Sequence, residues 1–159
     1  MPGIARYQVA RFEVEGLDFI IADMKRHGEL AGETAQEMLM AGAEEVKHAW
    51  KNEAERRNFK DTRSMIDNIG FPRSVKRASD ILSIDIYPQG KDARGVRNAE
   101  KAFILHWGTS SNSTRKRKAK KKFSGPGIPR TLWVDDADRA SGPRVLDAFT
   151  RIWDAFLKG

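Results

Sequence analysis

A stripe of apolar and small residues at helical spacing constrains the fold of this chain more than any other feature. Its members recur every three or four positions, and most charged residues nearby fall outside it. The stripe consists of Ala35, Met38, Leu39, Gly42, Val46, Ala49 and Trp50. This spacing predicts one amphipathic helix of about four turns that ends near Arg57. Such a helix has to bury its apolar face against another element.

Three small residues recur every seven positions along this stripe, at Ala35, Gly42 and Ala49. A glycine inside a helix costs about 1 kcal/mol relative to alanine. Its presence at position 42 therefore indicates that another element approaches the helix closely there. Packing within the chain's own core is the preferred interpretation, and a seam for self-association is the alternative.

Shorter elements flank this helix. Apolar alternation predicts an extended start over 7–14, and helical spacing over 17–28 predicts a short helix that Gly28 ends. A third short helix is expected after Asp61 and Thr62, which stand where an N-cap would.

The middle of the chain is predicted to form strands. Apolar residues alternate with polar ones over 82–87, which predicts a half-buried strand closed by a turn at 88–90. The stretch 73–78 is the candidate hairpin partner, with the turn at 79–80. The apolar run 102–107 is too short for its period to separate strand from helix, and we favour helix or turn.

The last third of the chain is expected to hold a short strand over 132–134 and then a helix introduced by Gly142-Pro143. One face of that helix is aromatic and apolar. It carries Val145, Leu146, Phe149, Ile152, Trp153 and Phe156. The order of helices, then strands, then a helix predicts an α+β fold, with both long helices packed on a small antiparallel sheet. A chain of 159 residues suits a single domain, 1–159.

Composition excludes several classes of protein. The chain has no cysteine, which rules out disulfides, thiol chemistry and most structural zinc sites. It also lacks the roughly 18 to 20 consecutive apolar residues of a membrane span and the pattern of a secretory signal. We therefore expect a soluble protein, made in a cytoplasm and without a membrane partner.

The net charge of +7 is concentrated in one segment. Its seven cations are Arg115, Lys116, Arg117, Lys118, Lys120, Lys121 and Lys122. Removing them from the 29 lysines and arginines leaves 22, which match the 22 acidic residues of the chain. The segment lies within a stretch without apolar periodicity, 108–127, which predicts a long basic loop.

Seven neighbouring cations can contact the phosphates of DNA or RNA without reading sequence. Because Phe123 is the one aromatic residue nearby, phosphate contact is favoured over base recognition. A solvated loop, or one that docks on an acidic protein neighbour, is the alternative.

No catalytic or cofactor-binding pattern stands out. His27, His48 and His106 are far apart in the sequence, so surface or packing roles are preferred over metal or catalytic roles. The carboxylates at 135, 136 and 138 could hold magnesium, but acidic residues at the start of a helix are the simpler interpretation. We expect no enzyme activity, no cofactor and no metal.

Three segments match a known pattern in order and spacing. Gly16-Leu17 opens a helix, an alanine-rich helix follows through positions 41–46, and 60–65 then leads to Ile69. The second segment, 102–109, is an aromatic-rich run that ends in Gly-Thr, and the third runs from Pro129 to a terminal helix. Together they resemble the siphophage head-to-tail joining or tail completion proteins, often described as minor tail components. The chain departs from that family at Arg63, His106 and 129–131, where glycine, glutamate and Pro-Phe-Leu are more usual.

The resemblance implies a structural subunit in a ring, expected to be hexameric, at the head-tail junction of a phage virion. The implied partners are its own copies, neighbouring neck and tail proteins, and packaged DNA touched by the basic loop. Candidate residues for the assembly interface are Trp107, Gly108, Thr109, Trp133 and Trp153. The main alternative is a small, non-specific nucleic-acid-binding module that uses the basic loop, and an enzyme of unknown type is a third.

Overall fold

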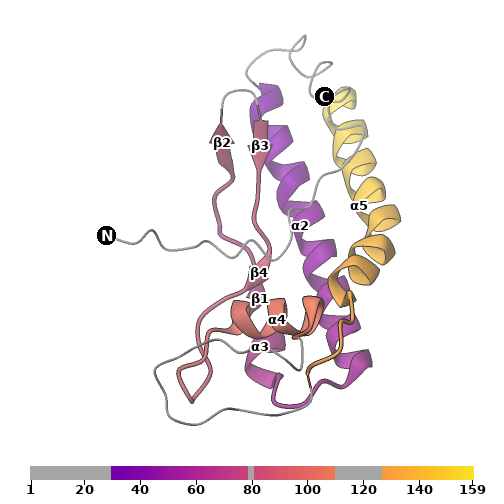
Figure 1. Cartoon of the computed structure of the whole chain (residues 1–159). Helices are drawn as coiled ribbons and strands as arrows, with labels where there is room; N and C mark the ends of the chain where they lie inside the picture. Colours follow the sequence, from indigo (N-terminus) through magenta and orange to yellow (C-terminus); the bar gives the residue numbers. More distant parts are fainter. Residues whose placement is uncertain (1–29, 79–80, 110–126) are drawn as a thin grey trace.

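The computed structural model describes residues 30–78, 81–109 and 127–159 (Figure 1). Helices, short strands and helices follow one another along the chain. The elements are α2 (Leu30–Arg57), α3 (Arg63–Asp67), β1 (Ile69–Gly70), β2 (Lys76–Ala78), β3 (Ile81–Ser83), β4 (Tyr87–Pro88), α4 (Asn98–Trp107) and α5 (Trp133–Lys158). The fold is α+β, as predicted. The predicted elements at 7–14 and 17–28 and the turn at 79–80 lie outside the described residues.

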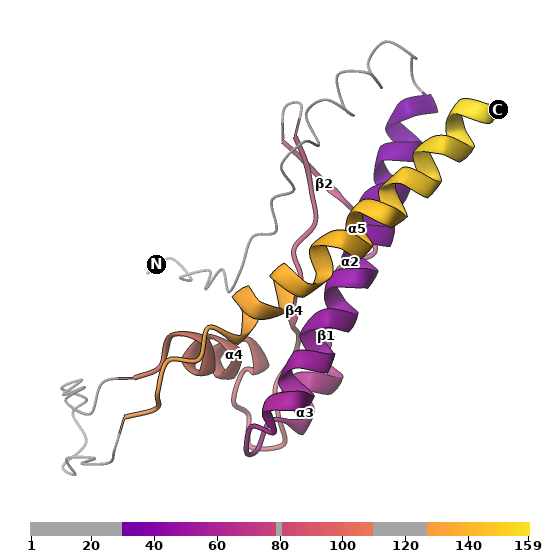
Figure 2. The same ribbon diagram turned by 90° about the vertical axis from the view of Figure 1, so that its right-hand side faces the viewer.

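The two long helices α2 and α5 form an antiparallel pair along most of their length (Figures 1 and 2). The predicted end of α2 at Arg57 is confirmed, and Asn58 follows with a positive φ of 49° that stops the helix. Arg57 also joins the end of α2 to the start of α5, since its guanidinium binds the carboxylate of Asp136 over 2.5 Å and the Thr131 carbonyl over 3.1 Å.

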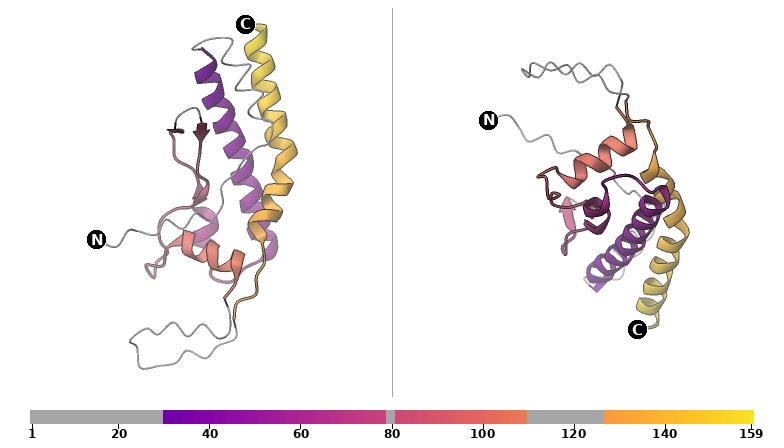
Figure 3. Two further views of the ribbon diagram at one scale, coloured as in Figure 1. Left: turned by 45° about the horizontal axis from the view of Figure 1, so that its top comes forward. Right: turned by 90° about the horizontal axis from the view of Figure 1, so that it is seen from below.

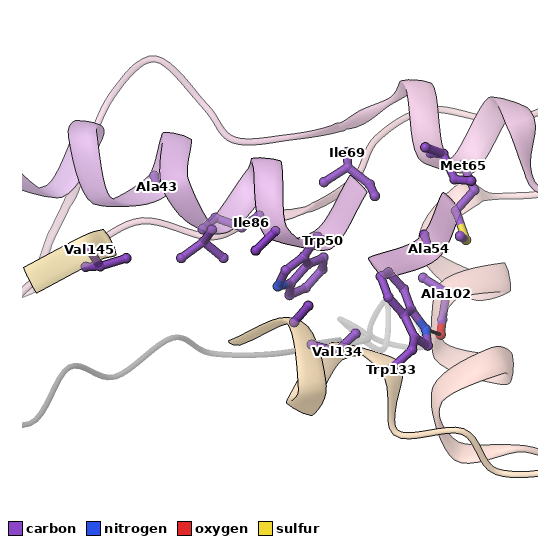
Figure 4. Packing of buried hydrophobic residues seen from close by; sticks show 14 of the residues in the cluster. Ala43, Trp50, Ala54, Met65, Ile69, Ile86, Ala102, Trp133, Val134 and Val145 are labelled. Atoms are coloured by element: carbon purple, nitrogen blue, oxygen red, sulfur yellow. Dashed lines mark hydrogen bonds between the residues drawn. The ribbon is translucent and has the colours of Figure 1, made fainter. Parts of the chain in front are cut away.

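The core fills the space between these helices and the shorter elements. Trp50 of α2 meets the edge of Trp133, with ring centroids 5.5 Å apart, and both side chains are almost fully buried (Figure 4). Farther along the pair, the aromatic ring of Phe149 lies against Gly42. A Cβ added at Gly42 would stand 2.7 Å from Phe149 Cε1. The interpretation of Gly42 as a close-packing position within the core is therefore confirmed.

Helices α3 and α4 and strands β1 and β4 pack at the end of the pair where α2 finishes and α5 begins (Figure 1). Helix α4 lies across this end (Figure 3), and its Ala102 is fully buried. Strand β1 pairs with β4 in antiparallel register, with Ile69 opposite Pro88. Thr62 precedes α3 as predicted, but its hydroxyl donates to the Phe59 carbonyl over 2.8 Å and does not cap the helix.

Strands β2 and β3 form an antiparallel hairpin beside α2 (Figure 1), with Lys76 opposite Ser83. The pairing of 73–78 with the following strand is thus confirmed over three residues. The strand predicted over 82–87 is shorter than expected, because β3 ends at Ser83. The chain then crosses to a second sheet, where Tyr87 belongs to β4, and only Ile86 between them is buried in the core.

The final helix corrects two predictions. Residues 132–134 do not form a strand, because α5 begins at Trp133, and Gly142-Pro143 lies inside that helix. Proline lacks the N–H that a helix interior uses, which normally breaks or kinks a helix. Here the buried face continues through Ser141 and Val145 on both sides of the proline, so packing along α5 offsets that loss.

Candidate functional site

Both ends of the predicted basic loop start from one place beside the C-terminus of α4. The Thr109 N–H donates to the Ile128 carbonyl over 2.8 Å, and the Ile128 N–H donates to Thr109 Oγ1 over 2.9 Å. Residues 110–126, including all seven cations of the basic segment, lie outside the described residues. The residues that join the two loop ends form a cluster that we call the loop clamp: Trp107, Gly108, Thr109, Ile128, Pro129 and Arg130.

Gly108 fixes the geometry of the loop clamp. Its N–H donates to the Ile104 carbonyl over 2.7 Å and closes α4, while its φ of +73° lies in the left-handed region that favours glycine. A Cβ at this position would stand 2.5 Å from the Ile128 carbonyl oxygen and 2.7 Å from the Arg130 nitrogen. Because both neighbours are backbone atoms, only glycine fits here.

The outer surface of the loop clamp combines aromatic and cationic groups. Trp107 is 46% exposed, and the guanidinium carbon of Arg130 lies 4.8 Å from the centroid of one of its rings. Ile128 beside them is 41% exposed. A guanidinium over an indole is held by cation–π attraction as well as by contact. Arg130 is not among the interface residues predicted from the sequence.

The charge around the loop clamp has one sign over a long stretch of sequence. From Lys101 to Val134, both included, the chain carries nine lysines and arginines and no aspartate or glutamate. The first carboxylate after this stretch is Asp135, whose Oδ1 lies 3.6 Å from Nε2 of His106. The loop clamp therefore joins the ends of a segment suited to a polyanionic partner.

His106 supports the loop clamp from inside. It is buried, its Nδ1 accepts the N–H of Val134 at 3.4 Å, and its carbonyl accepts the N–H groups of Thr131 and Leu132. Burial lowers the pKa of His106, the Asp135 charge opposes that change, and the Arg130 charge adds to it. These contacts give His106 a packing role.

The two other predicted interface tryptophans do not join the loop clamp. Trp133 is fully buried, and its Nε1 donates to the Ala102 carbonyl over 3.3 Å (Figure 4). Its prediction as an interface residue is therefore corrected, because its indole has no surface to offer. Trp153 is half-buried on α5 and stacks on Phe156, with ring centroids 5.2 Å apart.

The three carboxylates near the start of α5 have separate tasks. Asp135 and Asp136 occupy the first turn, where the helix dipole favours negative charge. Asp138 instead accepts a hydrogen bond from Trp50 Nε1 over 2.7 Å in the interface with α2. Burial raises the pKa of Asp138 from 3.8 to about 6; the Trp50 hydrogen bond opposes the rise, and Asp135 adds to it. The cluster is thus split between dipole compensation and helix packing.

Nothing in the described part of the chain assembles into a reaction centre. His48 is exposed beside Glu44, and His27 lies outside the described residues. Across the residues that the structure describes, no group of three or more histidine, aspartate or glutamate side chains is placed to hold a metal ion. A hollow between α2 and α5 is lined mainly by small and apolar residues, with Glu37 and Arg151 as its charged groups.

Among residues 30–78, 81–109 and 127–159, no helix has both the length and the apolar character that a membrane crossing requires. No protein-family model, no curated protein and no solved structure matches the chain.

Proposed function

We propose that the protein is a structural subunit of a tailed-phage virion, a tail completion or head-to-tail joining protein that acts by assembling into a ring with its own copies. The observation that carries the proposal is the loop clamp. The Gly-Thr pair at the end of the second family-like segment stands where only glycine fits and where Thr109 binds Ile128 twice. That motif thus has a physical task, which is to hold both ends of a cationic loop beside an exposed tryptophan.

The other family-like segments support the proposal through the core. The alanine-rich segment belongs to α2, where Gly42 receives Phe149 of α5. The segment that begins at Pro129 continues into α5. The resemblance therefore involves the residues on which the packing of the long helices depends.

Exposed apolar side chains supply surfaces for assembly. Leu146 and Leu157 of α5 are 50% and 53% exposed. Covering such side chains with a neighbouring subunit gains about 25 cal/mol per Å² of apolar surface. A non-enzymatic role at the head-tail junction, in contact with neck and tail proteins, fits a chain of this kind.

Light scattering across a range of protein concentrations tests the proposal. A ring-forming subunit is expected to exceed the 18.0 kDa of one chain and to approach a fixed multiple of it. Replacing the exposed Leu157 by serine should move this transition to higher concentration. The control Tyr87→Ser removes an exposed side chain away from α5 and should have a smaller effect. A mass of one chain at every concentration would contradict ring assembly.

A small nucleic-acid-binding module is the second candidate, favoured by the absence of acidic residues between Lys101 and Val134. It predicts a strict monomer that binds duplex DNA tightly at low salt and releases it at high salt. The same scattering experiment, repeated with duplex DNA, separates the two candidates because they differ in the mass of the free protein.

A further inference from the structure

We infer that Trp107 and Arg130 form a binding site for the phosphate backbone of DNA. The inference rests on the proposed function, because it names a partner for the loop clamp of the same subunit. The site consists of these two described side chains. Residues 115–122 lie outside the described residues and are not part of it.

Arg130 is oriented by an aromatic ring and has no acidic partner among the described residues. Its guanidinium lies 4.8 Å from the Trp107 ring centroid, and it makes no ion pair with any residue that the structure describes. By contrast, Arg57, Arg63 and Arg139 each face a carboxylate. A stacked guanidinium uses its flat face on the ring and keeps N–H donors on its edge, which suits the oxygens of a phosphate. Arg130 therefore combines a fixed plane with an uncompensated charge.

The surroundings favour a polyanion over a single anion. From Lys101 to Val134, both included, there are nine cations and no acidic residue, and the loop clamp holds both ends of the segment that carries seven of them. Duplex DNA presents one negative charge per roughly 1.7 Å of its axis, so it can satisfy such a density of cations.

An exposed indole argues for nucleic acid over an acidic protein surface. Trp107 is 46% exposed beside the guanidinium, and Ile128 adds an apolar surface next to it. Aromatic side chains stack on the faces of unpaired bases, whereas a carboxylate offers no face for such stacking. In the proposed site, the guanidinium of Arg130 binds a phosphate and the indole of Trp107 holds the guanidinium in place.

The test is fluorescence anisotropy with the full-length protein and a short, labelled duplex DNA of random sequence at several salt concentrations. Arg130→Gln removes one phosphate contact, so the slope of log K against log salt should fall by about 1. Binding at about 0.1 M salt should weaken about eightfold, which corresponds to one released counterion. Arg130→Lys keeps the charge but loses the planar stack, so its affinity should lie between the two.

Arg151→Gln is the matched control, because Arg151 is also an exposed arginine without an ion pair among the described residues, and it lies in the C-terminal half of α5, whereas Arg130 precedes that helix. Equal losses for Arg130→Gln and Arg151→Gln would overturn the inference, as would a wild-type protein that does not bind DNA at low salt. Displacement of the DNA by polyglutamate at equal charge concentration would point to an acidic protein partner and would also overturn it.

The outcome is independent of ring assembly. A monomer whose DNA binding depends on Arg130 would support the site and contradict ring assembly. A ring in which Arg130→Gln and Arg151→Gln bind DNA equally well would support ring assembly and contradict the site.

Discussion

Replacing Gly42 by alanine should destabilise the protein, even though alanine is the better helix former by about 1 kcal/mol. The new Cβ would stand 2.7 Å from Cε1 of Phe149, 3.1 Å from its Cζ and 3.2 Å from Cγ1 of Val145. Phe149 is only 2% exposed, so its ring has little space into which to move. Overpacking of a core costs about 1 to 3 kcal/mol. Subtracting the gain in helix propensity, we expect a net loss of up to about 2 kcal/mol in the free energy of unfolding.

Gly32→Ala is the control on the same helix. A Cβ at Gly32 would meet only the Arg77 guanidinium at 3.9 Å, an ordinary contact, so this variant should be as stable as the wild type or more stable, by up to about 1 kcal/mol. Urea unfolding at fixed protein concentration, followed by circular dichroism, measures both changes. For a chain of this length, the expected loss in Gly42→Ala corresponds to a fall in Tm of up to about 8 °C.

A second substitution identifies the cause of the loss. Phe149→Leu removes the ring that the new methyl group would meet. It should therefore lower the free energy of unfolding less in the Gly42→Ala background than in the wild type. If Gly42→Ala is as stable as Gly32→Ala, the close approach of α5 to Gly42 does not exist and the packing of the two helices is wrong as described.

Three further predictions concern the loop clamp and the helix interface. Gly108→Ala should lower the free energy of unfolding by about 2 kcal/mol or more in urea titrations, because a left-handed φ strains alanine and its Cβ meets backbone. The pKa of Asp138 is about 6 in the folded protein, above the ordinary 3.8, so the folded state binds the proton of this carboxyl group more tightly than the unfolded state does. The free energy of unfolding therefore falls as pH rises from about 4 to 6 and the carboxyl group loses that proton. At 1.36 kcal/mol per pKa unit, burying the charged carboxylate costs about 3 kcal/mol in the free energy of unfolding. Asp138→Asn should therefore be more stable than the wild type at pH 8 and should lose that advantage below pH 4. Deleting residues 116–122 should leave Tm nearly unchanged in a thermal melt, since the loop clamp closes without them.

The histidine interior to the loop clamp contributes the opposite pH trend. Burial lowers the pKa of His106, so its neutral form is favoured on folding, and stability is lost as pH falls below its ordinary value of 6.5. The difference between wild type and Asp138→Asn isolates the carboxyl contribution, because both proteins keep His106.

Much of the fold follows from periodicity. The stripe from Ala35 to Trp50 repeats long enough to predict α2 and its end at Arg57, and the cost of a mid-helix glycine correctly indicates the close approach at Gly42. The start of α5 could not be predicted in this way. Local preference places a helix start at Pro143, whereas burial of Trp133 ten residues earlier, which depends on α2 and α4, decides the outcome.

The candidate site is predictable only in part. Gly108-Thr109 stands out in the sequence, but its contacts with Ile128 and Arg130, about twenty residues later in the chain, are not visible in the sequence. An aromatic residue also looks the same in a sequence whether it is exposed or enclosed. Trp107 lies at the surface while Trp133 lies in the core, and the difference arises from where α4 and α5 meet.

Electron microscopy of the protein at the highest concentration it tolerates tests ring assembly most directly. We predict closed rings of one copy number, expected to be six, with a central opening wide enough for duplex DNA. A field without rings, from a sample whose sedimentation remains that of a single 18.0 kDa chain, would contradict the proposal.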